Sequence, residues 1–185
     1  PAINAFKADN SQVTVKLETS ATLAKLEVGE AHIAIRAGQK PTNPDYVVQL
    51  FCKIPFSLYA SDAYIARHGT PSATSLDKHQ FVYAQDEQAR YPFTKWFKAH
   101  VKDSQISLIT DDLLALSEAI KNGLGLGFMS VHDAAKTNNL RVIIPPTSDS
   151  IISVWMVTHI DLHRTIKVQS FTQHLKAHAS QLSYD

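Results

Sequence analysis

The chain has 185 residues, of which 44% are hydrophobic and 19% charged, and its formal net charge is +1. This is the composition of a soluble globular protein. It lacks the basic excess with which proteins grip nucleic acid phosphates, so we expect no DNA binding by this chain alone. No apolar run approaches the ~18 residues of a membrane span, and the first residues do not resemble a signal peptide. With a single cysteine, Cys52, no internal disulfide can form, and the sequence predicts a cytoplasmic protein.

The N-terminal third predicts two strands joined by a helix. Val13–Leu17 alternates apolar and polar residues, which is typical of a strand. Thr19 and Ser20 follow as helix N-cap residues, and Gly29 suits the end of that helix. The short apolar run Ala31–Ile35 predicts a buried strand.

The rest of the chain continues to alternate strands and helices. Val47–Ala60 is expected to be extended, with Pro55 marking a break or an edge position, and Ser61 with Asp62 caps a short helix. The later predicted elements are strands at 81–83, 105–109, 124–129, 140–144 and 151–158; a helix carrying Phe93, Trp96 and Phe97; a helix capped by Asp111, carrying Leu113, Leu116 and Ile120 and ended by Gly123; a capping box at 130–133; and a last helix with Val168, Phe171 and Leu175. This alternation predicts an α/β fold with parallel strand–helix–strand units, and the prolines near 55 and 145–146 indicate two small lobes.

The glycine-rich run Gly123–Gly127 does not predict a nucleotide site. A dinucleotide-binding loop follows a strand and opens a helix, whereas this run ends a helix and opens a strand. We therefore expect the glycines to permit a tight joint and close backbone packing.

Metal and catalytic motifs are also missing from the sequence. His174 and His178 lie one helical turn apart, but neither a cysteine nor a carboxylate accompanies them at a familiar ligand spacing, so we interpret them as a solvated helix face. The adjacent pair Asp111 and Asp112 cannot face each other as a catalytic dyad. We therefore expect no metal, no cofactor and no enzymatic activity.

Four segments, taken together and in order, resemble the effector-binding domain of LysR-type transcriptional regulators. Leu26–Arg36 is similar to the family stretch in which a helix ends at Gly-Glu and a strand begins, and Asn122–Phe128 is similar to its glycine-rich joint. Tyr64–Pro71 resembles its first helix after the lobe crossing, and Trp155–Arg164, followed by Val168–Phe171, resembles its closing strand and helix.

The resemblance implies two Rossmann-like lobes around a cleft, the fold of type 2 periplasmic binding proteins. Lobe I would comprise residues 1–60 and 147–185, and lobe II residues 61–146. It also implies an N-terminal winged helix-turn-helix outside this chain, antiparallel dimers or tetramers, and a small-molecule effector in the cleft. The sequence departs from the family in two ways: the strand and loop that usually open the domain do not precede Pro1, and His32 stands where an acidic residue is usual.

Seven side chains are candidates for contacting the effector, because ligands collect at the carboxyl ends of strands in α/β sheets and at helix N-termini. They are Thr19, Ser20, Arg36, Tyr83, Thr110, Asp111 and Phe128. Structural roles compete with this interpretation. Thr19, Ser20 or Asp111 can be simple helix caps, Tyr83 can be core, and Arg36 can pair with Glu30 or Asp45. Arg36 and the capped helix starts favour an anionic effector, whereas Asp111 would suit an amine such as that of an amino acid.

The leading functional hypothesis is thus an effector-sensing regulatory domain. A solute-binding protein of a transport system, with the same fold, is the first alternative, and it would need an export signal and a longer chain. A small enzyme on this fold is the second, and it would need a positioned nucleophile or base, which the sequence does not offer.

Overall fold

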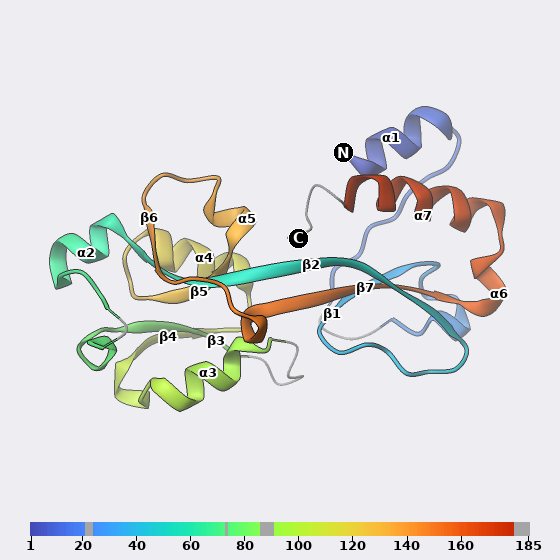
Figure 1. Ribbon diagram of the computed structural model, residues 1–185. Helices are drawn as coiled ribbons and strands as arrows, with labels where there is room; N and C mark the ends of the chain where they lie inside the picture. Colours follow the sequence, from blue (N-terminus) through green and yellow to red (C-terminus); the bar gives the residue numbers. More distant parts are fainter. Residues whose placement is uncertain (21–23, 73, 86–90, 180–185) are drawn as a thin grey trace. The chain divides into compact units, whose positions relative to one another are not determined.

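The computed structural model describes residues 1–20, 24–72, 74–85 and 91–179 (Figure 1). The chain divides into two compact units, unit 1 with residues 1–53 and 153–185 and unit 2 with residues 54–152. Two strands, β2 (Tyr46–Ser61) and β7 (Ile151–His159), pass from one unit into the other. The lobe limits expected from the sequence, at 60/61 and 146/147, stay a prediction.

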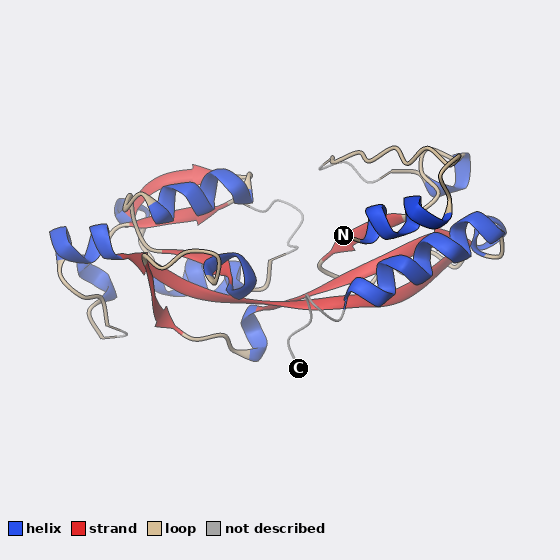
Figure 2. Ribbon diagram, turned by 90° about the horizontal axis from the view of Figure 1, so that it is seen from above, coloured by secondary structure: helices blue, strands red, loops and turns tan. Residues whose placement is uncertain are grey.

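Unit 1 is built around strand β7. Strand β1 (Ala34–Ala37) pairs with β7 in antiparallel register, from Ala34 opposite Val157 to Ala37 opposite Val154, and β2 is the other neighbour of β7. The helices of this unit are α1 (Ala2–Asp9), α6 (Ile160–His163) and α7 (Ile166–Ala179), with a 3-10 turn at Leu26–Val28. Helices α1 and α7 lie side by side (Figure 2).

The predicted strand at Val13–Leu17 is wrong. The segment has no regular structure, and Leu17 is 76% exposed. Alternation of apolar and polar residues shows that a segment could present one face to a core, but a strand also needs a partner to satisfy its backbone. No described segment pairs with Val13–Leu17.

The second predicted strand is present but is shifted and less buried than expected. It covers Ala34–Ala37 instead of Ala31–Ile35, and exposed residues alternate with half-buried ones along it. Ile35 is 48% exposed. Among the described residues β1 pairs only with β7, so it is an edge strand. The alternating exposure of its side chains shows that one of its faces is in solvent.

Unit 2 contains a mixed set of strand pairs. Strand β3 (Phe81–Ala84) runs parallel to β4 (Ile106–Thr110), as expected. However, β5 (Gly127–Ser130) and β6 (Leu140–Ile144) both pair with β2 in antiparallel register. The prediction of parallel strands alone was therefore wrong. The reason is that β2 enters unit 2 directly from unit 1, and no helical crossover forces it to run parallel with its neighbours.

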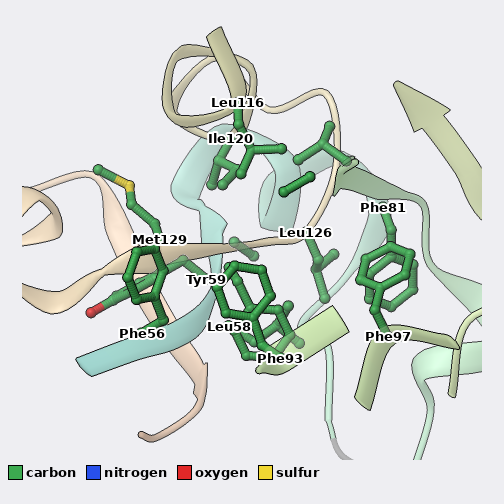
Figure 3. Close-up of a cluster of buried hydrophobic side chains, with 14 of the residues drawn as sticks. Phe56, Leu58, Tyr59, Phe81, Phe93, Phe97, Leu116, Ile120, Leu126 and Met129 are labelled. Carbon is green, nitrogen blue, oxygen red and sulfur yellow. The ribbon is translucent and has the colours of Figure 1, made fainter. Parts of the chain in front are cut away.

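Helices on unit 2 enclose an aromatic and aliphatic core. They are α2 (Asp62–His68), α3 (Phe93–His100), α4 (Leu113–Lys121) and α5 (Val131–Ala134), with 3-10 turns at Leu76–Lys78, Asp103–Gln105 and Ser148–Ser150. In Figure 3, Leu116 and Ile120 approach from α4 and Phe93 and Phe97 from α3, with Leu126 between them. Leu126 and Ile120 are fully buried.

The glycine run after α4 makes the close backbone packing that the sequence predicted. Gly123 has a positive φ of 76°, which favours glycine, and its carbonyl accepts a 2.6 Å bond from Arg67 Nη2. At Gly125 an added Cβ would lie 2.9 Å from the carbonyl oxygen of Gln80, because Leu126 exchanges 2.8 Å backbone bonds with Gln80 and Val82. These glycines therefore join α4 to the sheet.

Within the described ranges, no helix has the length and apolar character needed to cross a bilayer.

Candidate functional site

The parallel pair β3–β4 brings two of the predicted effector residues together. Tyr83 lies opposite Ile109, and the next pair is Ala84 opposite Thr110. Gln85 N donates to the Thr110 carbonyl at 2.9 Å, which extends the pairing to the carboxyl ends of both strands. The half-buried Tyr83 ring packs against Phe97 with 4.5 Å between centroids. Tyr83 and Thr110 thus share the strand end where α/β sheets collect ligands.

Asp112, and not Asp111, caps the helix that follows β4. Asp112 Oδ1 accepts from Leu114 N at 2.7 Å and from Ala115 N at 3.3 Å. The predicted capping role of Asp111 is therefore wrong, and its side chain is exposed. The apolar period that begins at Leu113 could have located the cap, because the N-cap is the residue directly before the first helical one.

Thr110 completes this turn. Its Oγ1 accepts from Asp112 N at 3.1 Å, so the strand end is tied to the helix start by one side-chain bond. Helix α4 therefore begins with its first amides already bonded to Asp112, and Asp111 lies between two residues with structural roles.

Phe128 lies in the core of unit 2. It is 5% exposed, stacks on Phe93 at 4.8 Å with 10° between the planes, and meets Trp96 edge-on at 5.2 Å. Its expected effector role stays a prediction.

A groove of about 380 Å³ opens on unit 2 between α4 and α5. Its floor is apolar, and its rim carries two ion pairs, Lys121 with Glu118 at 3.0 Å and Lys136 with Asp133 at 2.7 Å. The lining residues are Phe56, Leu113, Leu114, Leu116, Ser117, Lys121, Phe128, Met129, Ser130, Asp133, Lys136 and Thr137. Apart from Phe128, the sequence analysis named none of them as functional. They come from three segments that are far apart in the sequence. In the sequence each residue has a sufficient structural role as a core residue, a helix-face residue or a cap, so none of them indicates a groove.

The groove favours the charged form of the Asp133 carboxylate. Partial burial raises the pKa of Asp133, but hydrogen bonds from Lys136 and Ser130 lower it more, and the pKa lies below its ordinary value. Ser130 Oγ accepts from Asp133 N at 3.0 Å, so Ser130 is the N-cap of α5. It donates to Asp133 Oδ2 at 2.7 Å, so the carboxylate bonds the Ser130 hydroxyl instead of its backbone amide, and only the N-cap half of the predicted capping box is confirmed.

In unit 1, Arg36 has a structural role. Its Nη2 donates to the Ala24 carbonyl at 2.9 Å, and its guanidinium lies 5.3 Å from the centre of the Tyr46 ring. Tyr46 in turn donates to Glu27 Oε2 at 2.7 Å, a bond that lowers the pKa of Glu27 and raises that of Tyr46. Arg36 Nε is buried with no bond to any described residue. The guanidinium therefore ties the segment before β1 to the sheet and keeps one donor unused.

Thr19 and Ser20 lie in an exposed stretch of irregular backbone. The helix that they were predicted to cap would begin at 21–23, outside the described residues. From residue 24 onwards only the 3-10 turn Leu26–Val28 follows, ended by Gly29 with φ of 75° as expected.

Metal ligands do not gather in the part of the chain that the structure describes. No group of three or more His, Cys, Asp or Glu side chains is placed to hold an ion there. Cys52 is buried, and burial raises the pKa of its thiol. His174 and His178 are half-buried and bonded to backbone carbonyls, so the interpretation as a solvated face was wrong.

Comparison with known protein families decides the affiliation. The family model described as "LysR substrate binding domain" matches residues 1–180. The chain belongs to this family. The resemblance inferred from the sequence is thereby confirmed. No curated protein matches the chain in sequence.

Solved structures of LysR-type regulators share the fold. The full-length virulence activator AphB of Vibrio cholerae superposes with a TM-score of 0.72 and 18% identity, over 96% of this chain and 62% of AphB. The CrgA regulatory domain of Neisseria meningitidis gives 0.73 and 20%, over 99% and 91%. The AmpR effector domain of Pseudomonas aeruginosa gives 0.71 and 20%, over 98% and 88%. The expected type 2 periplasmic-binding-protein-like fold is confirmed, and this chain spans less than two thirds of full-length AphB.

Proposed function

We propose that this chain is the effector-sensing domain of a LysR-type transcriptional regulator, which binds a small molecule and thereby changes how the regulator acts on DNA. The observation that carries the proposal is the family match over residues 1–180. The regulatory and effector domains of CrgA and AmpR, which superpose over nearly all of this chain, support it. They also favour it over a solute-binding protein of a transport system.

The proposal includes partners and location. DNA would be bound by an N-terminal domain outside this chain, as the 62% coverage of full-length AphB suggests. The domain would form dimers or tetramers, act in the cytoplasm and catalyse no reaction. Residues 1–60 with 147–185 would move as one lobe, and residues 61–146 as the other. The effector would act by binding one conformation more tightly than another.

Within unit 2 we place the effector contacts at the carboxyl ends of β3 and β4. Thr110 and Tyr83 lie there in adjacent register, and the exposed carboxylate of Asp111 is not taken by helix capping. An exposed acid next to strand ends suits a ligand that carries an amine. Phe128 would support these contacts from the core through its stack with Phe93.

Within unit 1 the proposed contacts are Arg36, Thr19 and Ser20. Arg36 retains a buried Nε donor, and a guanidinium with an unused donor can bind a carboxylate. The contacts of unit 1 taken by themselves favour an effector with a carboxylate.

The test is thermal denaturation of the chain against a panel of amino acids, small carboxylates and aromatic acids. A ligand at about 100 times its Kd adds about 2.7 kcal/mol, which raises the Tm by about 5–11 °C for a domain of this size. Asp111→Asn should abolish the shift caused by an amine-bearing hit. Glu118→Gln, at an exposed acid within helix α4, which begins two residues after Asp111, is the matched control and should keep it. A hit that is unaffected by Asp111→Asn and Arg36→Gln would contradict the site, and a panel without any hit would contradict the ligand class.

A further inference from the structure

Helix α1 is fastened to helix α7 by an apolar contact and a polar one. Phe6 is 2% exposed and meets Phe171 edge-on, with 4.8 Å between ring centroids. Beside it, His174 of α7 packs edge-on against the same Phe6 ring at 5.6 Å. His174 Nε2 also lies 3.0 Å from Asp9 Oδ2, at the end of α1. His174 therefore contacts α1 at two points, with its ring against Phe6 and with Nε2 against Asp9.

Both ring nitrogens of His174 face oxygen acceptors. Nδ1 lies 2.8 Å from the Ser170 carbonyl, and Nε2 faces the Asp9 carboxylate. A neutral imidazole has one N–H and one lone pair, so it can satisfy only one of these oxygens, whereas the imidazolium donates to both. The geometry is that of the protonated ring.

We propose that protonated His174 is a pH-responsive latch that holds helix α1 on helix α7. With the proton bound, the ring donates to Ser170 and to Asp9 and pairs its charge with the carboxylate. When the proton is lost, one of the two oxygens faces a nitrogen lone pair, and α1 keeps only its apolar contact through Phe6.

The surroundings leave Asp9 as the charge that governs His174. On α1 the other charged side chain, Lys7, donates to the carbonyls of Ser11 and Val13. On α7, His178 bonds through Nδ1 to the His174 carbonyl, and Lys167 and Lys176 are exposed.

The direction of the pH effect follows from the two bonds. The Ser170 carbonyl and the Asp9 carboxylate raise the pKa of His174 above its ordinary value. A group whose pKa is raised on folding contributes its stabilisation fully at low pH and loses it as the pH rises through the folded-state pKa. The latch is therefore closed below the ordinary pKa of histidine and opens as the pH rises through the raised folded-state pKa of His174.

Hydrogen exchange of the α1 amides in the complete chain tests the latch. We expect their protection factors, corrected for intrinsic exchange, to fall about twofold to fivefold between about pH 6 and about pH 8.5, the range that one solvent-accessible ion pair supports. Asp9→Asn keeps the size of a largely exposed side chain but removes its charge, and it should abolish this pH dependence. His174→Gln should do the same.

His178→Gln is the matched control. His178 makes the same bond to the carbonyl four residues before it on the same helix, but no carboxylate of the described residues pairs with it. This variant should keep the pH dependence of α1. The His174 ring resonance gives a second readout, because its titration midpoint should move to lower pH in Asp9→Asn. Protection of α1 that does not change with pH, or a pH dependence that survives in Asp9→Asn, would overturn the latch.

Discussion

The joint between α4 and β5 yields a quantitative prediction for Gly123→Ala. Alanine at a left-handed φ of 76° costs about 1–2 kcal/mol, offset by about 0.4–1 kcal/mol from the stiffer unfolded chain. Its Cβ would lie 2.5 Å from Arg67 Nη2 and 3.1 Å from Tyr64 N. The arginine can move away only by giving up its bond to the Gly123 carbonyl, and a hydrogen bond to a charged group contributes about 1.5–3 kcal/mol. Together these contributions predict a loss of about 2–5 kcal/mol.

Urea unfolding followed by circular dichroism measures this loss, and Gly29→Ala is the control. Gly29 has nearly the same φ, 75°, but an added Cβ would meet no atom within 4 Å. Its replacement should therefore cost no more than about 1.6 kcal/mol. In thermal melts these losses correspond to a fall in Tm of about 4–20 °C for Gly123→Ala and less than about 6 °C for Gly29→Ala. Equal losses in the two variants would refute the argument that the close approach of Arg67 distinguishes Gly123.

Three further predictions concern single side chains of unit 2 and can be read from urea unfolding curves. Asp112→Ala should cost about 1 kcal/mol because the cap of α4 is lost, whereas Asp111→Ala should stay within about 0.5 kcal/mol; the reverse order would mean that Asp111 is the cap. Leu126→Ala, at a fully buried side chain, should cost about 2–5 kcal/mol through lost burial and a cavity, and a loss below about 1 kcal/mol would contradict the assigned core. Asp62→Asn breaks a bidentate pair with Arg141, but both side chains are about half exposed, so the loss should be below about 1 kcal/mol and should vanish at high salt.

Elements with both a local pattern and a local terminator were predictable from the sequence. Helix α2 follows its N-cap Ser61, whose Oγ accepts from Tyr64 N at 3.2 Å, as expected, and it ends before Gly69, which has a positive φ. The N-cap at Ser130 and the last helix were also predicted correctly. In these cases the physical cause lies within a few residues of the element, so the sequence carries it in full.

Predictions failed where the cause was a distant partner. Val13–Leu17 has the alternation of a strand but no described segment to pair with, and no local pattern contains that information. The direction of β2 relative to β5 and β6 depends on how the chain enters unit 2 from unit 1, which again is a property of topology. The groove between α4 and α5 could not be foreseen because Phe56 and Lys136 are brought to it only by folding.

The two charged candidates, Asp111 and Arg36, differ in whether their side chains also stabilise the fold. This difference decides what a loss of ligand response means in each variant. At the end of β4, capping is done by Asp112 and the turn is tied by Thr110, so the exposed Asp111 can change without loss of structure. Arg36 instead bonds the Ala24 carbonyl and packs over Tyr46, so replacing it removes structure as well as charge. A loss of ligand response in Asp111→Asn at unchanged Tm therefore reports on binding alone. The same loss in Arg36→Gln carries that meaning only after the fall in Tm of the ligand-free variant has been subtracted.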